Sequence, residues 1–526
     1  MLSFSTLSTL PHDYSKIFQQ ELRETLASSP LKRGISSDER AQLEAKAKEG
    51  DAKAALTLAR ITSLCARGDK ERAEAYGWYE RAAATGDPEA LRGLACCVNS
   101  GYGCKLDRHK ALQLCARAAK LGNLNAIIDM GLAYANGDGI AEDLEKAARC
   151  FQLAVDRGSG KACSELARCY LYGEGVEEDS EKAKKLLLLG IERGSGTTAF
   201  NLGVAYYNGL LDGADGCDYP KARDCFEKAC ALGYPAYYEL AMTYLRGEGI
   251  PVDQHKGLNV LMRGAEADDP ASLVELGKLY LRGDKDWRKI HDPQKGYRCL
   301  QRACELGYGP AFSICAGFYE EGYGLEASDP ARAVKILELG ARCGDKESAF
   351  RLGSCYAHGN CGLQPDGQRA LAYYERAFEL GSSDAAAILG CSYKHGEGAP
   401  QDTEKGLYYL RSGAERGNGA CLYELACSYA DGDGVEEDME KYKELLFKAA
   451  DEDFAMAVGE IGMSYLEGVG GFPQDYAKAV EYLEDAVELG MDECLEPLAN
   501  CYQKGLGVEK DKARAKELLR RAKEAE

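Results

Sequence analysis

The sequence predicts an all-α solenoid of about thirteen two-helix repeats, each 36 to 39 residues long. Three observations lead to this fold class. A tyrosine recurs at a nearly constant interval, a Gly-x-Gly turn follows it in most copies, and an aspartate then opens a second amphipathic segment. The recurring tyrosines are Tyr134, Tyr170, Tyr206, Tyr244, Tyr280, Tyr319, Tyr356, Tyr393, Tyr429, Tyr465 and Tyr502.

Two earlier copies keep the same phase, with Val98 and Thr62 at the tyrosine position, which brings the count to thirteen. A fixed period in this range indicates stacked helical pairs. One pair cannot bury both of its apolar faces, but neighbouring pairs bury them against each other, and this selects similar residues at a constant spacing.

The first half of each repeat reads as a helix with one apolar face. In one copy Ala162, Leu166 and Tyr170 stand at i, i+4 and i+8, with Ala167 beside Leu166. Small side chains at these places allow a neighbouring helix to approach closely.

A tight turn and a capped second helix follow. Gly173 and Gly175 supply the positive φ angles that such a turn needs. An aspartate then precedes the second helix in twelve copies, where its carboxylate can accept hydrogen bonds from free backbone N–H groups. These residues are Asp107, Asp143, Asp179, Asp218, Asp253, Asp292, Asp329, Asp366, Asp402, Asp438, Asp475 and Asp511.

Glycine closes most of the second helices, since it best tolerates a left-handed C-terminal cap. Asp268 and Asp453 hold the equivalent place in two copies. The glycines are Gly86, Gly122, Gly158, Gly194, Gly233, Gly307, Gly344, Gly381, Gly417 and Gly490.

Together, the Leu-Gly-x-x-Tyr motif, the Gly-x-Gly turn, the aspartate, a following Lys-Ala pair and an Ala-x-x-x-Gly ending resemble the Sel-one-like repeat, a relative of the tetratricopeptide repeat. The resemblance covers residues 51–526. It implies a right-handed superhelix whose first helices face inward, and it implies an adaptor that binds protein partners.

The ends of the chain depart from the period. Residues 1–50 predict N-terminal capping helices, because Pro11 opens a segment with an apolar stripe of Ile17, Phe18, Leu22 and Leu26. The polar final segment "KARAKELLRRAKEAE" is suited to cap the other end of the stack.

Composition narrows the class of partner and the compartment. The net charge of −20 would repel nucleic acid and anionic membranes. No segment approaches the ~20 consecutive apolar residues of a membrane span, and the N-terminus does not read as a signal peptide. We therefore predict a protein of the bacterial cytoplasm with mostly reduced cysteines, or alternatively one exported without a cleaved signal.

A basic and aromatic stripe is expected on the inward positions of four consecutive first helices. It could be a groove in which cations hold carboxylates and aromatic rings anchor an extended peptide or an amphipathic helix. The alternative is a solvated face whose aromatics pack within the stack. The residues are Arg168, Tyr172, Phe200, Tyr207, Tyr238, Met242, Arg246, Lys278 and Arg282.

Further along the chain, the charge at one inward position changes sign, and this change could orient a bound chain. It is occupied by Glu321, His358, His395, Asp431 and Glu467.

Two other features are candidates for a binding site or a metal site. Trp287 lies among cations in a loop three residues longer than the pattern, so it is either part of a binding loop or tucked onto its neighbour. Thiols and imidazoles gather near "CYAHGNC", and such groups suit zinc, but their spacing matches no familiar zinc motif and we predict no metal site. The candidate ligands would be Cys355, His358, Cys361, Cys391 and His395.

Catalytic signatures are poor. The chain has no Walker A loop, no H-E-x-x-H and no G-x-S-x-G, and the Ser29 to Lys32 pair lacks the companion motifs of penicillin-binding enzymes. We predict a non-enzymatic scaffold without a cofactor that binds a protein or peptide on its concave face, with a monomer favoured. The alternative functions are a hydrolase or binder of cell-wall or β-lactam-type substrates, and an exported effector that uses the same surface.

Overall fold

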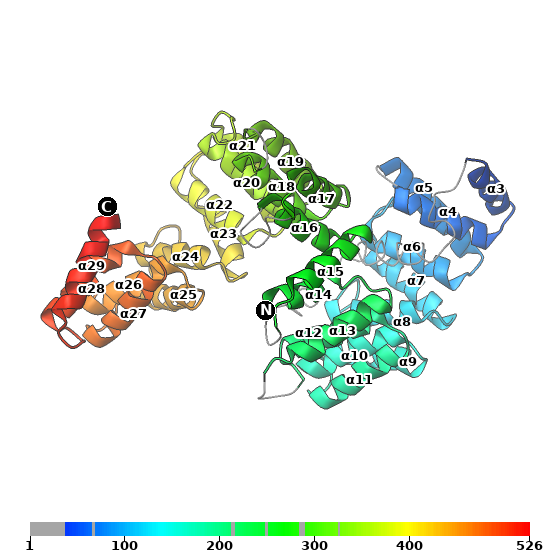
Figure 1. Cartoon of the computed structure of the whole chain (residues 1–526), viewed down its shortest axis with the longest axis horizontal. Helices are drawn as coiled ribbons and strands as arrows, with labels where there is room; N and C mark the ends of the chain where they lie inside the picture. Colours follow the sequence, from blue (N-terminus) through cyan, green and yellow to red (C-terminus); the bar gives the residue numbers. More distant parts are fainter. Residues whose placement is uncertain are drawn as a thin grey trace. The chain divides into compact units, whose positions relative to one another are not determined.

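The computed structural model describes residues 37–65, 69–211, 216–247, 251–282, 290–323 and 327–525. Within these ranges the regular structure is α-helical, apart from one short 3₁₀ turn at Asp492–Cys494 (Figure 1). No strand occurs in the described ranges. The predicted all-α solenoid of paired helices is therefore confirmed.

The helices alternate between the two halves of the repeat. The first helices are α4 (Ala52–Cys65), α6 (Pro88–Ser100), α8 (Leu124–Asn136), α10 (Gly160–Tyr172), α12 (Gly196–Tyr207), α14 (Tyr237–Arg246), α16 (Pro270–Arg282), α18 (Gly309–Glu321), α20 (Lys346–His358), α22 (Ser383–His395), α24 (Gly419–Asp431), α26 (Ala455–Glu467) and α28 (Leu495–Lys504). The second helices are α5 (Asp69–Ala84), α7 (Arg108–Lys120), α9 (Leu144–Asp156), α11 (Ser180–Glu192), α13 (Tyr219–Ala231), α15 (Gln254–Glu266), α17 (Pro293–Glu305), α19 (Pro330–Arg342), α21 (Gly367–Glu379), α23 (Thr403–Ala414), α25 (Met439–Asp451), α27 (Tyr476–Glu488) and α29 (Lys512–Ala525).

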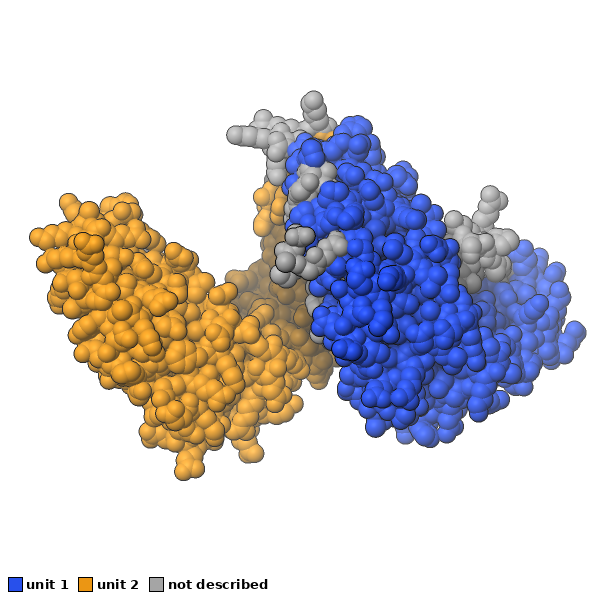
Figure 2. Space-filling view, turned by 90° about the horizontal axis from the view of Figure 1, so that it is seen from below, with its two compact units in different colours: residues 1–267 blue, residues 268–526 orange. Residues whose placement is uncertain are grey.

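The chain forms two compact units, residues 1–267 and residues 268–526, which Figure 2 shows in separate colours. In each unit every first helix packs against the second helix of its own repeat, and that second helix packs against the first helix of the next repeat. Each unit therefore has a core that runs along its repeats.

A main-chain hydrogen bond closes the hairpin between the two helices in twelve of the thirteen repeats. The backbone N–H of Asp179 donates to the carbonyl oxygen of Tyr170 at 2.8 Å, and its carboxylate accepts from the backbone N–H of Lys182 at 2.8 Å. The same main-chain bond joins the capping aspartate to the residue at the tyrosine position in all twelve copies, at 2.7–3.1 Å. All twelve aspartates also cap their helices, as predicted.

The recurring tyrosine ring has a further role that sequence reasoning missed. The cation three residues after the aspartate lies over this ring in ten repeats, with 3.9–5.9 Å between the charged group and the ring centre. In three repeats the tyrosine hydroxyl also donates to a glutamate on the preceding second helix: Tyr244 to Glu227, Tyr393 to Glu375 and Tyr502 to Glu484. The ring thus joins the two halves of one repeat, and the hydroxyl joins neighbouring repeats.

In several repeats, the second glycine of the Gly-x-Gly turn is needed for stacking as well as for its backbone conformation. Gly175 has φ +71°, and a Cβ atom there would lie 2.1 Å from the carbonyl oxygen of Leu144 in the preceding repeat. Any larger residue would push the two repeats apart.

The longer loops keep the same closure. Asp218 bonds to Tyr206 at 2.9 Å and Asp292 bonds to Tyr280 at 3.0 Å, although three extra residues separate each pair. The additional residues are therefore accommodated without changing the hairpin. Trp287 lies outside the described residues.

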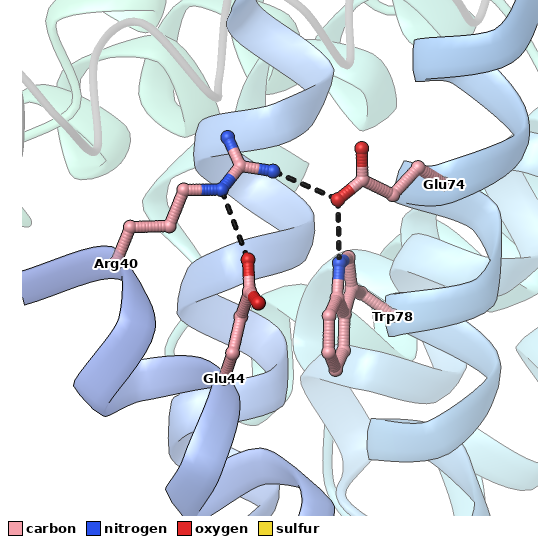
Figure 3. Close-up of polar contacts among 4 residues, drawn as sticks. All are labelled: Arg40, Glu44, Glu74 and Trp78. Atoms are coloured by element: carbon pink, nitrogen blue, oxygen red, sulfur yellow. Dashed lines mark hydrogen bonds and ion pairs between the residues drawn. The ribbon is translucent and has the colours of Figure 1, made fainter. Parts of the chain in front are cut away.

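An additional helix, α3 (Ser37–Lys48), packs on the first repeat. Arg40 bonds to Glu44 of the same helix at 3.1 Å and to Glu74 of α5 at 2.7 Å, and Glu74 also accepts from the indole N–H of Trp78 at 3.4 Å (Figure 3). The prediction of capping helices over residues 1–50 falls mostly on residues 1–36, which lie outside the described residues, and it stays a prediction.

We predict that Gly175→Ala destabilises the protein much more than Gly158→Ala. Both glycines have positive φ angles, but a Cβ on Gly158 would meet nothing within 4 Å. Gly158→Ala should therefore lower the free energy of unfolding by about 1 kcal/mol through backbone strain alone. Gly175→Ala adds the clash with Leu144 and should cost at least about 3 kcal/mol. Urea unfolding followed by circular dichroism measures both values, and equal losses would contradict the stacking role.

Candidate protein-interaction surface

The first helices of some neighbouring repeats contact each other directly. In the first unit α10 contacts α12 directly, and in the second unit α18 contacts α20 and α22 contacts α24. No pair of second helices within the described ranges makes comparable contact. At these places the first helices lie closer together than the second helices do. The exposed residues of the first helices in each unit are here called the first-helix face.

The last residue of most first helices is exposed, and its chemistry changes from repeat to repeat. In the second unit the five positions predicted to carry a change of sign are all exposed at these helix ends: Glu321, His358, His395, Asp431 and Glu467. In the first unit Asn136, Tyr172 and Arg246 stand at the equivalent ends.

Arg168, the first residue of the predicted basic stripe, is mostly engaged within the fold. Its side chain, in a residue 8% exposed, bonds through Nη1 to Glu174, and its Nε lies 3.7 Å from Glu165. These carboxylates outweigh the effect of burial and raise the pKa of the guanidinium. Tyr172, one turn further along α10, is 42% exposed.

The aromatic members Phe200 and Tyr207 contribute mainly to packing within their own repeat. The ring of Phe200 lies 4.9 Å from that of Tyr234, and Tyr207 makes an edge contact with Tyr219 at 5.1 Å. Tyr207 and Met242 are buried. Only Tyr172 and Arg246 of the first-unit members are exposed, while Tyr238 is half-buried.

One polar group of this region lacks a partner. Asn201 of α12 is 6% exposed, and its Oδ1 accepts no hydrogen bond from any described residue. An unsatisfied buried oxygen costs free energy, so a donor from water or from a bound chain would be favourable there.

The members of the stripe in the second unit both lie on α16. Lys278 pairs with Glu275 at 2.5 Å, and Arg282 is exposed at the end of the helix. Whether any member of the stripe contacts a partner stays a prediction.

A hydrogen-bonded cluster in the second unit was not anticipated from the sequence. Glu460 of α26 accepts from the hydroxyls of Tyr423 and Tyr442, each at 2.6 Å. Burial and these bonds to Glu460 raise the pKa of both hydroxyls. No motif signals this cluster, since its members come from three helices.

The metal-ligand candidates do not assemble into a metal-binding group. No set of three or more His, Cys, Asp or Glu side chains arranged for a metal occurs among the described residues. The thiols of Cys355 and Cys361 lie 3.5 Å apart, whereas Nδ1 of His358 lies 3.0 Å from the carbonyl oxygen of Ser354 in its own helix.

The cysteines behave largely as small apolar residues. Cys169, Cys355, Cys421, Cys494 and Cys501 are all buried. Burial raises the pKa of Cys169 and of Cys421 to about 12, so little reactive thiolate is present near neutral pH.

None of the described helices combines the length and the apolar composition that crossing a membrane requires.

Comparison with known proteins identifies the repeat. The sequence model of the Sel1 repeat matches thirteen segments, which together cover well over half of the chain: residues 63–87, 88–123, 124–159, 160–195, 198–234, 235–259, 270–308, 315–345, 346–382, 383–418, 419–454, 455–491 and 498–526.

Curated relatives match parts of this repeat region. Chitin synthase regulatory factor 3 of Schizosaccharomyces pombe is 28% identical over 186 residues, which is 34% of this chain and 20% of that protein. The ERAD-associated E3 ubiquitin-protein ligase component HRD3B of Arabidopsis thaliana is 25% identical over 252 residues, 38% of this chain and 40% of that protein. The chain thus spans a fifth to two fifths of the length of these relatives.

Two solved structures of repeat proteins are similar to this chain at low identity. A protective antigen of uropathogenic Escherichia coli that displays an SLR fold is 24% identical, with a TM-score of 0.42, over 85% of this chain and 94% of that one. A Sel1 repeat protein from Oxalobacter formigenes is 21% identical, with a TM-score of 0.36, over 48% of this chain and 96% of that one.

We predict that Arg168 and Tyr172 differ sharply in their effect on stability, although both were predicted as binding residues. Arg168→Ala leaves two carboxylates without their cation in a mostly buried place and should lower the free energy of unfolding by about 3 kcal/mol. Tyr172→Ala removes an exposed ring and should change it by less than about 0.5 kcal/mol. Chemical denaturation of the two variants tests this, and a stable Arg168→Ala protein would show that the ion pairs contribute little.

Proposed function

The chain belongs to the Sel1 repeat family, and on that premise we propose that it is a non-enzymatic scaffold that binds a protein or peptide along the first-helix face. One observation carries this proposal. The residues that recur from repeat to repeat make the contacts that close and stack the hairpins. The exposed residues at the ends of the first helices, in contrast, vary.

This division is what a recognition surface requires. A fixed interior holds the face rigid, and rigid presentation reduces the entropy lost on binding. Varied exposed groups then supply the chemical pattern that selects one partner over others. Tyr172 and Arg246 offer a ring and a cation in the first unit, and Asp431 and Glu467 offer carboxylates in the second.

The names of the relatives agree with a role of this kind. One is a regulatory factor of chitin synthase and another is a component of a ubiquitin ligase. For this chain we infer a regulatory or adaptor role, with the partner and the cytoplasmic location as predictions.

Site-specific photo-crosslinking tests the proposal. A photoreactive benzoylphenylalanine is placed at Tyr172 or His395 on the first-helix face, and in control proteins at Leu188 or Tyr408, which are exposed on second helices. After irradiation in cells that produce the protein, we expect discrete protein adducts from the first pair and none of the same mass from the controls. The same adducts from the controls, or adducts from the controls alone, would place the partner elsewhere.

We predict further that the cations of the stripe select an acidic partner. Charge reversal by Arg246→Glu and Arg282→Glu should weaken capture of the crosslinked partner at least tenfold, because like charges then face its carboxylates. The matched control reverses Lys185 and Lys335, which are exposed on second helices of the two units. Binding measured by surface plasmon resonance checks both proteins, and unchanged binding by the first variant would reject the basic stripe while leaving the scaffold role intact.

A further inference from the structure

Cys361 occupies a backbone position that glycine holds in most repeats of this chain. It stands where the second glycine of the Gly-x-Gly turn stands in most repeats, and its φ of +58° matches the +71° of Gly175. Among the described residues only Asp268 and Asp453 are other non-glycine residues with positive φ, and aspartate tolerates this region better than most side chains. A cysteine held there carries backbone strain that the fold does not need.

At this position the thiol of Cys361 lies beside a second thiol. Its Sγ lies 3.5 Å from Sγ of Cys355, which is on the last turn of α20 and is 7% exposed. Cys361 itself is half-buried, so a small reagent can reach it. Small side-chain rotations would bring the two sulfurs to bonding distance, since six residues separate them within one hairpin.

We propose that Cys355 and Cys361 are a reversible redox site, in which a disulfide joins the turn between α20 and α21 to the last turn of α20. This site is independent of the proposed scaffold function and of any partner. It requires only these two thiols and a low-molecular-weight disulfide, such as oxidised glutathione, as the oxidant.

The reaction proceeds by two exchange steps. The Cys361 thiolate attacks one sulfur of oxidised glutathione, the glutathione disulfide breaks, and one glutathione thiolate leaves. The Cys355 thiolate then attacks the Cys361 sulfur of this mixed disulfide, and the second glutathione thiolate leaves. Two protein thiols are oxidised, one glutathione disulfide is reduced to two thiols, and the two protons go to the leaving thiolates.

The surroundings of the pair make this exchange slow near neutral pH. Glu320 of α18 accepts from the Cys361 thiol at 3.5 Å, and Arg351 of α20 pairs with the same carboxylate at 2.7 Å. Burial, the neighbouring Cys355 and Glu320 raise the pKa of Cys361 to about 12, and burial also raises the pKa of Cys355. The thiolate fraction, and hence the rate, should increase about tenfold for each pH unit between pH 7 and pH 9.

Mass spectrometry of the full-length protein tests the proposal directly. Trypsin releases residues 352–369 as one peptide that contains both thiols and no other cysteine. After incubation with oxidised glutathione, acid quenching and alkylation, we expect this peptide to lose two hydrogens and carry no alkyl group, and dithiothreitol should reverse the change. A peptide that stays doubly alkylated, or that carries only glutathione, would overturn the proposal.

Two conservative variants serve as controls. Cys361→Gly restores the residue found at this place in most repeats, and Cys355→Ser introduces the residue that precedes the tyrosine at Ser392 and Ser428. Both variants should fold. Cys361→Gly should unfold at a temperature no lower than the parent protein, because glycine adopts a positive φ without the strain of a side chain. Oxidised glutathione should raise the unfolding temperature of the parent protein alone. An equal shift in the variants would assign the effect to other thiols and reject this pair.

Discussion

The hydrogen bond from the backbone N–H of the capping aspartate to the carbonyl oxygen of the recurring tyrosine is the constraint on which the rest of the structure depends. It fixes where the second helix starts relative to the end of the first. The aspartate carboxylate then satisfies the free N–H groups of that second helix, and the cation one turn later covers the tyrosine ring. One short segment therefore sets the geometry of each hairpin, and the loop between the two bonded residues can lengthen without disturbing it.

Stacking adds a second constraint, which acts between repeats. At Gly103, Gly175 and Gly507 the glycine turn brings the backbone of one repeat against the first turn of the preceding second helix. In three repeats a tyrosine hydroxyl also donates to a glutamate of the preceding second helix. These contacts hold neighbouring repeats together and leave the exposed residues of the first helices for other uses. The variable side chains of the first-helix face are supported by contacts that recur, which is the basis for assigning recognition to it.

Departures from the repeated pattern are informative for the same reason. A cysteine in place of the turn glycine breaks a local rule without improving the packing, and it stands beside another thiol. Asn201 of α12 likewise leaves a buried oxygen without a donor among the described residues. In an array of similar repeats, each residue can be compared with the residues at the same position of the other repeats. A residue that departs from them without helping the fold is therefore a candidate for another role.

The sequence by itself determined the repeat, the helix boundaries, the capping aspartates and the left-handed glycine ends, because these depend on contacts between residues a few positions apart. Only the tertiary structure decided that Arg168, Tyr207 and Met242 are used within the stack, and that Glu460 gathers two tyrosines. Such contacts join residues of different helices, and the depth at which a side chain is buried depends on how closely those helices pack, which no local pattern records.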